Sequence, residues 1–120
     1  MRTLTITMTT DWRASLDRAG EDFIAAWQHG GYQGESLLFE TPAMFFGRLS
    51  ARRWEIVRAL QGRGPLIVRE LARSIGRDVR RVHEDVRALV ELGLIEKTPD
   101  GRIECPFADI HVDMHLQQAA

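Results

Sequence analysis

The scarcity of several features narrows what this protein can be. Its single cysteine, Cys105, rules out a disulfide within the chain, which is typical of proteins in a reducing compartment. No apolar run approaches the roughly 18 residues needed to span a bilayer. The N-terminus also lacks the basic region, apolar stretch and small-residue cleavage site of a signal peptide. The sequence therefore predicts a cytoplasmic protein that does not associate with a membrane.

Motifs that mark enzymes are also missing. We find no glycine-rich phosphate loop after a predicted strand, no nucleophile elbow, no paired-cysteine motif and no acid/base pair at a fixed spacing. We therefore expect no enzyme activity and no bound cofactor.

Charge is unevenly distributed along the chain, although the net charge is only −1. Residues 48–93 hold eleven arginines, no lysine and six acids, whereas residues 1–47 and 94–120 each carry a net charge of −3. Arginine forks onto phosphate and guanine, so this bias favours a nucleic-acid partner. A solvated helical surface is the alternative that charge alone leaves open.

Residues 1–47 predict a strand-helix-strand extension. The alternation in Thr3–Met8 is typical of a half-buried strand, and Glu35–Glu40 reads as a second one. Between them, large apolar residues recur at helical spacing from Trp12 to Trp27, so both tryptophans, like Trp54 further on, are expected in the core. We expect this extension to serve packing or dimerisation.

Three helices are predicted next, followed by a hairpin. Ser50 caps a helix over 51–60, a second covers about Leu66 to Ile75 and ends at Gly76, and a third runs from the cap Asp78 to Leu92. The third helix is expected to bury one apolar stripe, made up of Val79, Val82, Val86, Leu89 and Val90. Residues 94–105 form the hairpin around a turn at 98–101, residues 110–116 form a last strand, and residues 117–120 are a flexible tail.

The outward face of the third helix carries the candidate chemistry. Arg80 and Arg81 lie in its first turn and are placed to fork onto guanine. Glu84 can accept from cytosine, while His83 and Arg87 are better placed for phosphate. The pattern is typical of a helix that lies in the DNA major groove.

Residues 64–95 resemble MarR-type winged-helix regulators. The resemblance rests on Gly64-Pro65-Leu66, on Arg69 to Val79 and on Val82 to Ile95, and it extends over about residues 50–110. More narrowly, the chain is similar to a compact set of predicted transcriptional regulators with the signatures GRD and VHEDV, here residues 76–78 and 82–86. Some of these are thought to be antitoxins encoded beside a small toxin.

This resemblance implies a positioning helix at 66–75, a recognition helix at 78–92 and a wing at 97–102. Lys97 and Arg102 would then reach phosphate or a minor groove. One departure is Ile67, where the family often has a serine that caps the positioning helix.

The sequence thus predicts an α+β fold, a winged helix-turn-helix at 48–116 with a strand-helix-strand extension at 1–47. The expected function is sequence-specific binding of double-stranded DNA by a transcriptional regulator, a repressor that acts as a homodimer. The alternative is a winged-helix module that binds a protein such as a partner toxin. The expected DNA-contacting residues are Arg69, Arg77, Arg80, Arg81, His83, Glu84, Arg87, Lys97 and Arg102.

The polar residues of the last strand and Cys105 allow less specific interpretations. His111, Asp113 and His115 share one face of the last strand and could bind a divalent ion, but Val112, Met114 and Leu116 on the other face make a solvent-exposed polar face the simpler interpretation. Cys105 shares a face with Ile103 and is most simply a small core residue. We therefore expect no metal site.

Overall fold

The structure is a computed structural model that describes residues 1–8 and 34–115. Its fold is α+β, as predicted, and it divides into two units. One unit comprises residues 47–108 with Met1, and the other comprises residues 2–46 and 109–120. The last strand begins in the first unit and ends in the second.

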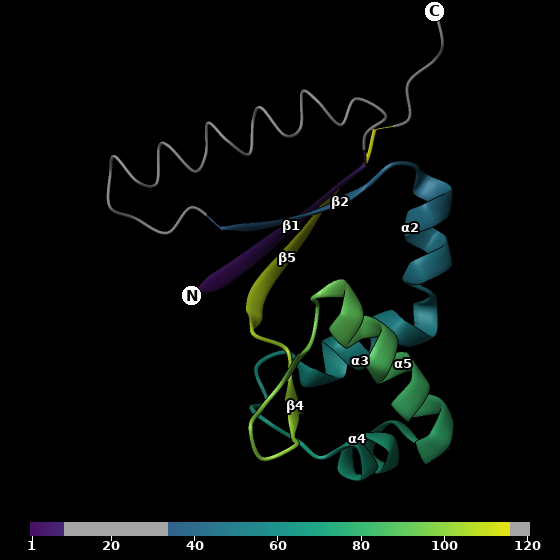
Figure 1. Cartoon of the computed structure of the whole chain (residues 1–120), viewed down its shortest axis with the longest axis vertical. Coiled ribbons are helices and arrows are strands. Elements are labelled where there is room, and N and C mark those ends of the chain that lie inside the picture. The colour runs from purple at the N-terminus through teal and green to yellow at the C-terminus, as the bar shows by residue number, and fades with distance from the viewer. Residues whose placement is uncertain (9–33, 116–120) are drawn as a thin grey trace, which may run out of the picture. The chain divides into compact units, whose positions relative to one another are not determined.

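A three-stranded sheet contains β1 (Arg2–Met8), β2 (Glu35–Phe39) and β5 (Phe107–Asp113) in the order β2-β1-β5 (Figure 1). β1 and β2 run parallel, which requires a crossover connection between them. The predicted helix from Trp12 to Trp27 lies outside the described residues, as does the tail at 117–120.

The helix that follows β2 begins at a threonine cap. α2 (Pro42–Arg48) begins with proline, and the Thr41 hydroxyl accepts a hydrogen bond from the Met44 amide at 3.1 Å. Phe45 is buried and meets Phe39 of β2 edge-on, with ring centroids 5.6 Å apart. α2 is therefore anchored to the sheet by aromatic packing.

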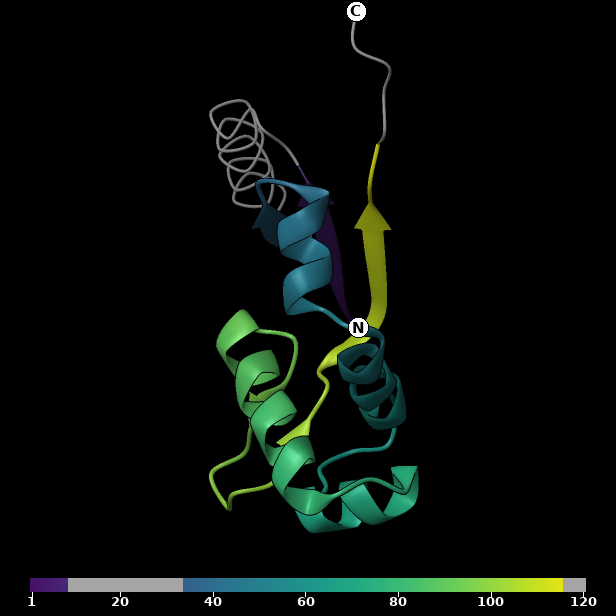
Figure 2. The same cartoon turned by 90° about the vertical axis from the view of Figure 1, so that its right-hand side faces the viewer.

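The unit that comprises residues 47–108 contains the arginine-rich segment, and we call it the basic unit. Its helices are α3 (Ala51–Leu60), α4 (Val68–Ile75) and α5 (Val79–Leu92). Figure 2 shows α4 beside the ends of the other two, and all three pack on one another. The predicted caps are confirmed, because Ser50 accepts from the Arg53 amide at 3.4 Å and Asp78 accepts from the Arg81 amide at 3.2 Å. α4 and α5 both end at a left-handed glycine, as predicted. The residues that these helices bury completely include Ile56, Leu60, Leu71, Val82 and Leu89.

The start of α4 corrects one prediction. Leu66 was expected in this helix, but its backbone forms two hydrogen bonds with Ile103, at 2.9 and 2.8 Å. A pairing with a residue 37 positions away therefore takes the backbone groups that a helix would have used. α4 begins at Val68, and its N-cap Ile67 offers no side-chain hydrogen bond.

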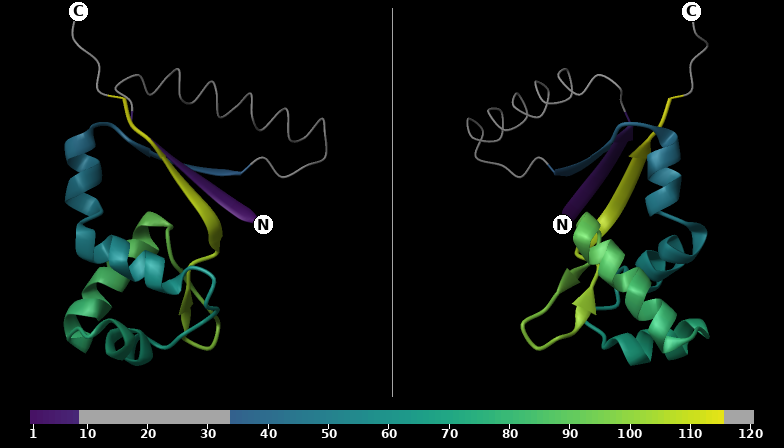
Figure 3. Two further views of the ribbon diagram at one scale, coloured as in Figure 1. Left: turned by 180° about the vertical axis from the view of Figure 1, so that it is seen from behind. Right: turned by 45° about the vertical axis from the view of Figure 1, so that its right-hand side comes forward.

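The predicted hairpin is confirmed with shorter strands, β3 (Glu96–Lys97) and β4 (Ile103–Glu104). Its loop projects away from the helices in the right-hand view of Figure 3. Gly101 has the expected positive φ of 83°. Because Leu66 pairs with the other edge of β4, the hairpin is fastened to the segment that leads into α4.

The predicted core is wrong at several positions. Val79, the first residue of α5, is 41 % exposed, and Trp54 and Val90 are only half-buried. β5 starts at Phe107 rather than Ile110, and Val112, expected to be buried, is 36 % exposed on this edge strand. Cys105 does lie in the core, and burial raises the pKa of its thiol.

Candidate nucleic-acid interface

The outward face of α5 carries an exposed group of charged side chains. Val82, Val86 and Leu89 are buried on the inner side, and this determines which side of the helix faces outward. The exposed residues near its start are Arg80, Arg81, His83, Glu84 and Arg87, all of which were predicted to contact DNA. We call this group the α5 face.

The α5 face is electrically positive and open to a ligand. Within residues 1–8 and 34–115, none of Arg80, Arg81 and Arg87 forms an ion pair. Four of the residues, together with Asp78 and Val79, line an open surface hollow of about 740 Å³. At the N-terminal end of α5 the Asp78 carboxylate accepts from the Arg81 amide, so the positive charge there comes from the arginine side chains. An anionic partner therefore meets unpaired guanidinium groups here.

Neighbouring elements contribute three further predicted residues. Arg69 is exposed in the first turn of α4, and Lys97 is exposed on β3. Arg102, at the base of the hairpin loop, has its Nε 3.3 Å from Asp100 Oδ2, and both side chains are well exposed. All three belong to the same structural unit as α5.

The hairpin loop is ordered by its own polar groups. The Thr98 amide donates to the Arg102 carbonyl at 2.8 Å, and the Arg102 amide donates to the Thr98 hydroxyl at 3.0 Å. The same hydroxyl hydrogen-bonds to Asp100, which is the main reason why the pKa of Asp100 lies below its usual value. The loop therefore keeps an ionised carboxylate beside Arg102 at neutral pH.

Arg77 is placed differently from the other predicted contacts. Its side chain is only 11 % exposed, and Nη2 lies 2.9 Å from Asp85 Oδ2. The guanidinium is therefore directed into the unit, and the expectation that Arg77 reaches DNA has no support in its placement. Arg77 follows the left-handed Gly76, and its own amide donates to the Ala72 carbonyl at 3.0 Å, so its backbone belongs to the cap of α4.

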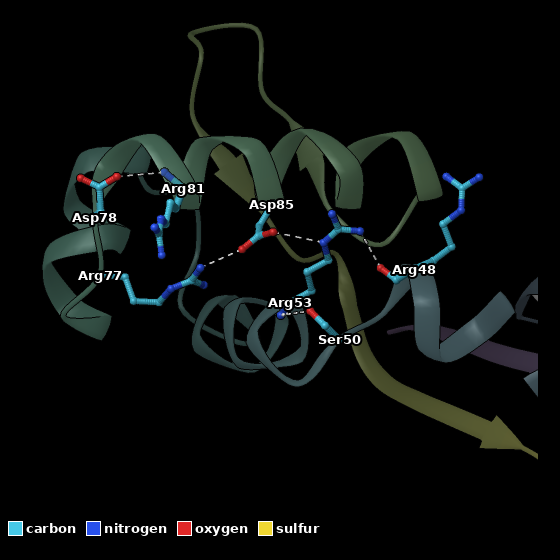
Figure 4. A network of polar contacts seen from close by, with 7 residues as sticks. All are labelled: Arg48, Ser50, Arg53, Arg77, Asp78, Arg81 and Asp85. Carbon is cyan, nitrogen blue, oxygen red and sulfur yellow. Dashed lines mark hydrogen bonds and ion pairs between the residues drawn. The ribbon is translucent and has the colours of Figure 1, made fainter. Parts of the chain in front are cut away.

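The sequence reasoning missed Asp85, which also receives a hydrogen bond from Arg53 Nε at 3.1 Å (Figure 4). A signal for it was present: Asp85 lies three residues after Val82 and four before Leu89, so it is an acid next to the buried stripe. Acids in such positions are rarely buried without a cationic partner.

The polar side chains of the last strand region do not gather into a metal site within the described residues. The described residues contain no group of histidine, cysteine and acidic side chains that could hold a metal ion. In the last strand region, His115 Nε2 lies 2.9 Å from Asp113 Oδ1, so these two side chains engage each other. In the part of the chain that the structure describes, no helix has the length and apolar character needed to cross a bilayer.

Comparison with known proteins identifies a family. No curated protein and no solved structure is significantly similar to the chain. A family profile, HVO_A0114, matches residues 48–112, which is more than half of the 120 residues and includes α3, α4, α5, the hairpin and most of β5. The chain therefore belongs to the HVO_A0114 family.

Proposed function

We propose that this protein is a transcriptional regulator that binds double-stranded DNA and inserts α5 into the major groove. The observation that carries this proposal is the α5 face, where three exposed arginines lack ion-pair partners within the described residues. An exposed arginine can donate two hydrogen bonds to one guanine or phosphate, and the α5 face carries three arginines against one acid, Glu84.

The order and pairing of elements support a winged helix-turn-helix. α4 and α5 are joined by the short turn 76–78, and a hairpin follows α5 directly. The antiparallel bridge between Leu66 and Ile103 places a third extended segment beside the hairpin. In such an arrangement α4 positions the second helix and the loop 98–102 acts as the wing.

Different residues serve different parts of the duplex in this proposal. Arg80 and Arg81, in the first turn of α5, read base edges, and Glu84 selects for a cytosine amino group. The remaining contacts go to phosphates and come from Arg69, His83, Arg87, Lys97 and Arg102. Arg102 is the weakest of these because Asp100 competes for its guanidinium.

Two copies would act together. A single inserted helix makes few contacts, whereas two helices one helical turn apart on DNA bind a palindromic site with far higher affinity. A dimer that covers a promoter would act as a repressor.

The test is selection of bound sites from a random pool of duplex DNA at low salt. We expect enrichment of one sequence with two inverted half-sites, and we expect Arg80→Ala together with Arg81→Ala to abolish the enrichment. Arg58→Ala together with Arg52→Ala is the matched control, because both are exposed arginines on α3, outside the α5 face.

No retention of duplex DNA by the wild-type chain at low salt would refute the proposal. Equal loss of enrichment in the control variant at Arg52 and Arg58 would show that the net charge of the protein alone is responsible for DNA binding. A salt-independent complex with another protein would instead favour the protein-binding module.

A further inference from the structure

Asp85 is the only acid described on α5 that forms ion pairs, and it forms two. Its Oδ1 lies 3.1 Å from Arg53 Nε, and its Oδ2 lies 2.9 Å from Arg77 Nη2. Figure 4 shows the carboxylate directed from α5 toward α3, between the two guanidinium groups. The three side chains are 18 %, 25 % and 11 % exposed, so water screens these contacts only in part.

The three side chains connect several elements of the basic unit. Arg53 lies on α3, and its Nη1 also donates to the Arg48 carbonyl at 2.8 Å, at the end of α2. The last carbonyls of a helix have no partner within it, so this hydrogen bond satisfies one of them. Arg77 lies in the turn between α4 and α5. Asp85 therefore ties α5 to α3 and to the turn from which α5 starts.

The buried guanidinium of Arg77 requires the Asp85 carboxylate as its counter-charge. Its Nε and Nη1 are buried and have no hydrogen-bond partner among the described residues, so Asp85 supplies its one polar contact there. A buried guanidinium without a counter-charge is strongly unfavourable. Removing the Asp85 carboxylate would therefore drive Arg77 toward solvent and change the turn at the start of α5.

Apolar packing alone does not fix the orientation of α5 so closely. The contacts of Val82, Val86 and Leu89 are non-directional, and a helix can rotate or tilt slightly on such a surface at small cost. Two charge-assisted hydrogen bonds to one carboxylate are directional. They lie on the side of α5 that faces α3, while the α5 face lies on the outside.

We infer that Asp85 is a positioning residue, which together with Arg77 and Arg53 sets the rotation of α5 and so the direction in which Arg80, Arg81 and Arg87 are presented. This inference rests on the proposed function for its DNA readout. It assigns Arg77 to the support of the reading helix instead of to the DNA.

The first test compares Asp85→Asn with Glu91→Gln in the full chain. Glu91 is an exposed acid on the same helix, so both variants remove one negative charge from α5 and have the same long-range effect on DNA attraction. Asparagine keeps the size of aspartate but can accept from only one of the two arginines as before, and its amide repels the other. The probes are the duplex obtained by site selection and a scrambled duplex of the same length, titrated well below the melting temperature of each variant.

For Asp85→Asn we expect affinity for the selected duplex to fall about tenfold, the equivalent of one lost bidentate base contact. Affinity for the scrambled duplex should stay within about twofold, because phosphate contacts tolerate a small rotation. Glu91→Gln should bind both duplexes as the wild type does, or slightly more tightly. If Asp85→Asn binds the selected duplex like Glu91→Gln, the inference is wrong.

A second variant separates positioning from stability. Arg77→Met combined with Asp85→Asn removes the stranded buried charge and should recover most of the melting temperature lost in Asp85→Asn. Positioning predicts that the double variant still binds the selected duplex weakly. Recovery of affinity along with melting temperature would show that Asp85 acts only on stability.

A measurement without DNA completes the test. Residual dipolar couplings of backbone amides report the orientation of α5 relative to α3, and they should change in Asp85→Asn but not in Glu91→Gln. If the wild-type chain bound no DNA, the proposed function would fail while this measurement still decided the role of Asp85. Unchanged couplings in Asp85→Asn would overturn it.

Discussion

The salt dependence of DNA binding should separate the residues that contact phosphates from those that read bases. Each phosphate contact releases condensed counterions, so it contributes about −0.9 to the slope of log K against log salt concentration. Base contacts contribute to affinity mainly through hydrogen bonds and depend on sequence. Replacing one residue of each kind should therefore give different results in the same assay.

The structure sets the expected magnitude. Arg69, Arg87 and Lys97 are exposed and form no ion pair within the described residues, whereas Arg102 is engaged by Asp100. Two copies with about three phosphate contacts each give a slope near −5. Raising salt from about 50 to about 200 mM should then weaken binding by about a factor of 10³.

Lys97→Gln should lower the magnitude of this slope by about 2 in a dimer and weaken binding to every duplex alike. Arg80→Gln should instead cost about 1 to 3 kcal/mol at the selected site only, with a smaller change in slope. Fluorescence anisotropy of a labelled duplex over a range of salt concentrations measures both quantities.

Arg58→Gln on α3 serves as the control, and its slope should equal that of the wild type. A wild-type slope near zero would refute the assignment of the α5 face to DNA. If Lys97→Gln left the slope unchanged, the hairpin would not touch the backbone.

Three more results are expected. Asp78→Ala should lower the free energy of unfolding by about 1 kcal/mol in chemical denaturation because the Arg81 amide loses its cap, and Asp78→Ser should restore most of it. Asp100→Asn should tighten duplex binding a few-fold, because it releases Arg102 and removes a carboxylate near phosphate. Since the pKa of Asp100 is lowered, the wild type should show the same gain only when strongly acidic conditions protonate this carboxylate. Equal duplex binding by the variant and the wild type at neutral pH would argue against competition between Asp100 and phosphate. Cys105 should react slowly with a disulfide reagent near neutral pH in the native protein and rapidly in denaturant, because burial raises the pKa of its thiol; rapid native reaction would contradict its place in the core.

Several elements could be predicted from sequence because their signals are local. Ser50 and Asp78 cap helices by bonding to amides three residues away, and Gly76 ends α4 through its own backbone conformation. The α5 face follows from the period of the buried stripe, since knowing that Val82, Val86 and Leu89 point inward determines which residues point outward. None of these inferences required knowledge of distant parts of the chain.

Tertiary structure decided the features that depend on partners far away in the sequence. Leu66 leaves the helix because Ile103 offers its backbone a pairing, and Arg77 turns inward because Asp85, held between α3 and α5, offers a counter-charge. The sequence by itself determined the caps of α3 and α5, the end of α4 and which arginines α5 exposes. Only the tertiary structure decided which charged side chains form ion pairs within the protein. A charged group pairs with the groups that the fold brings within a few ångströms of it, and spacing in the sequence does not reveal that distance.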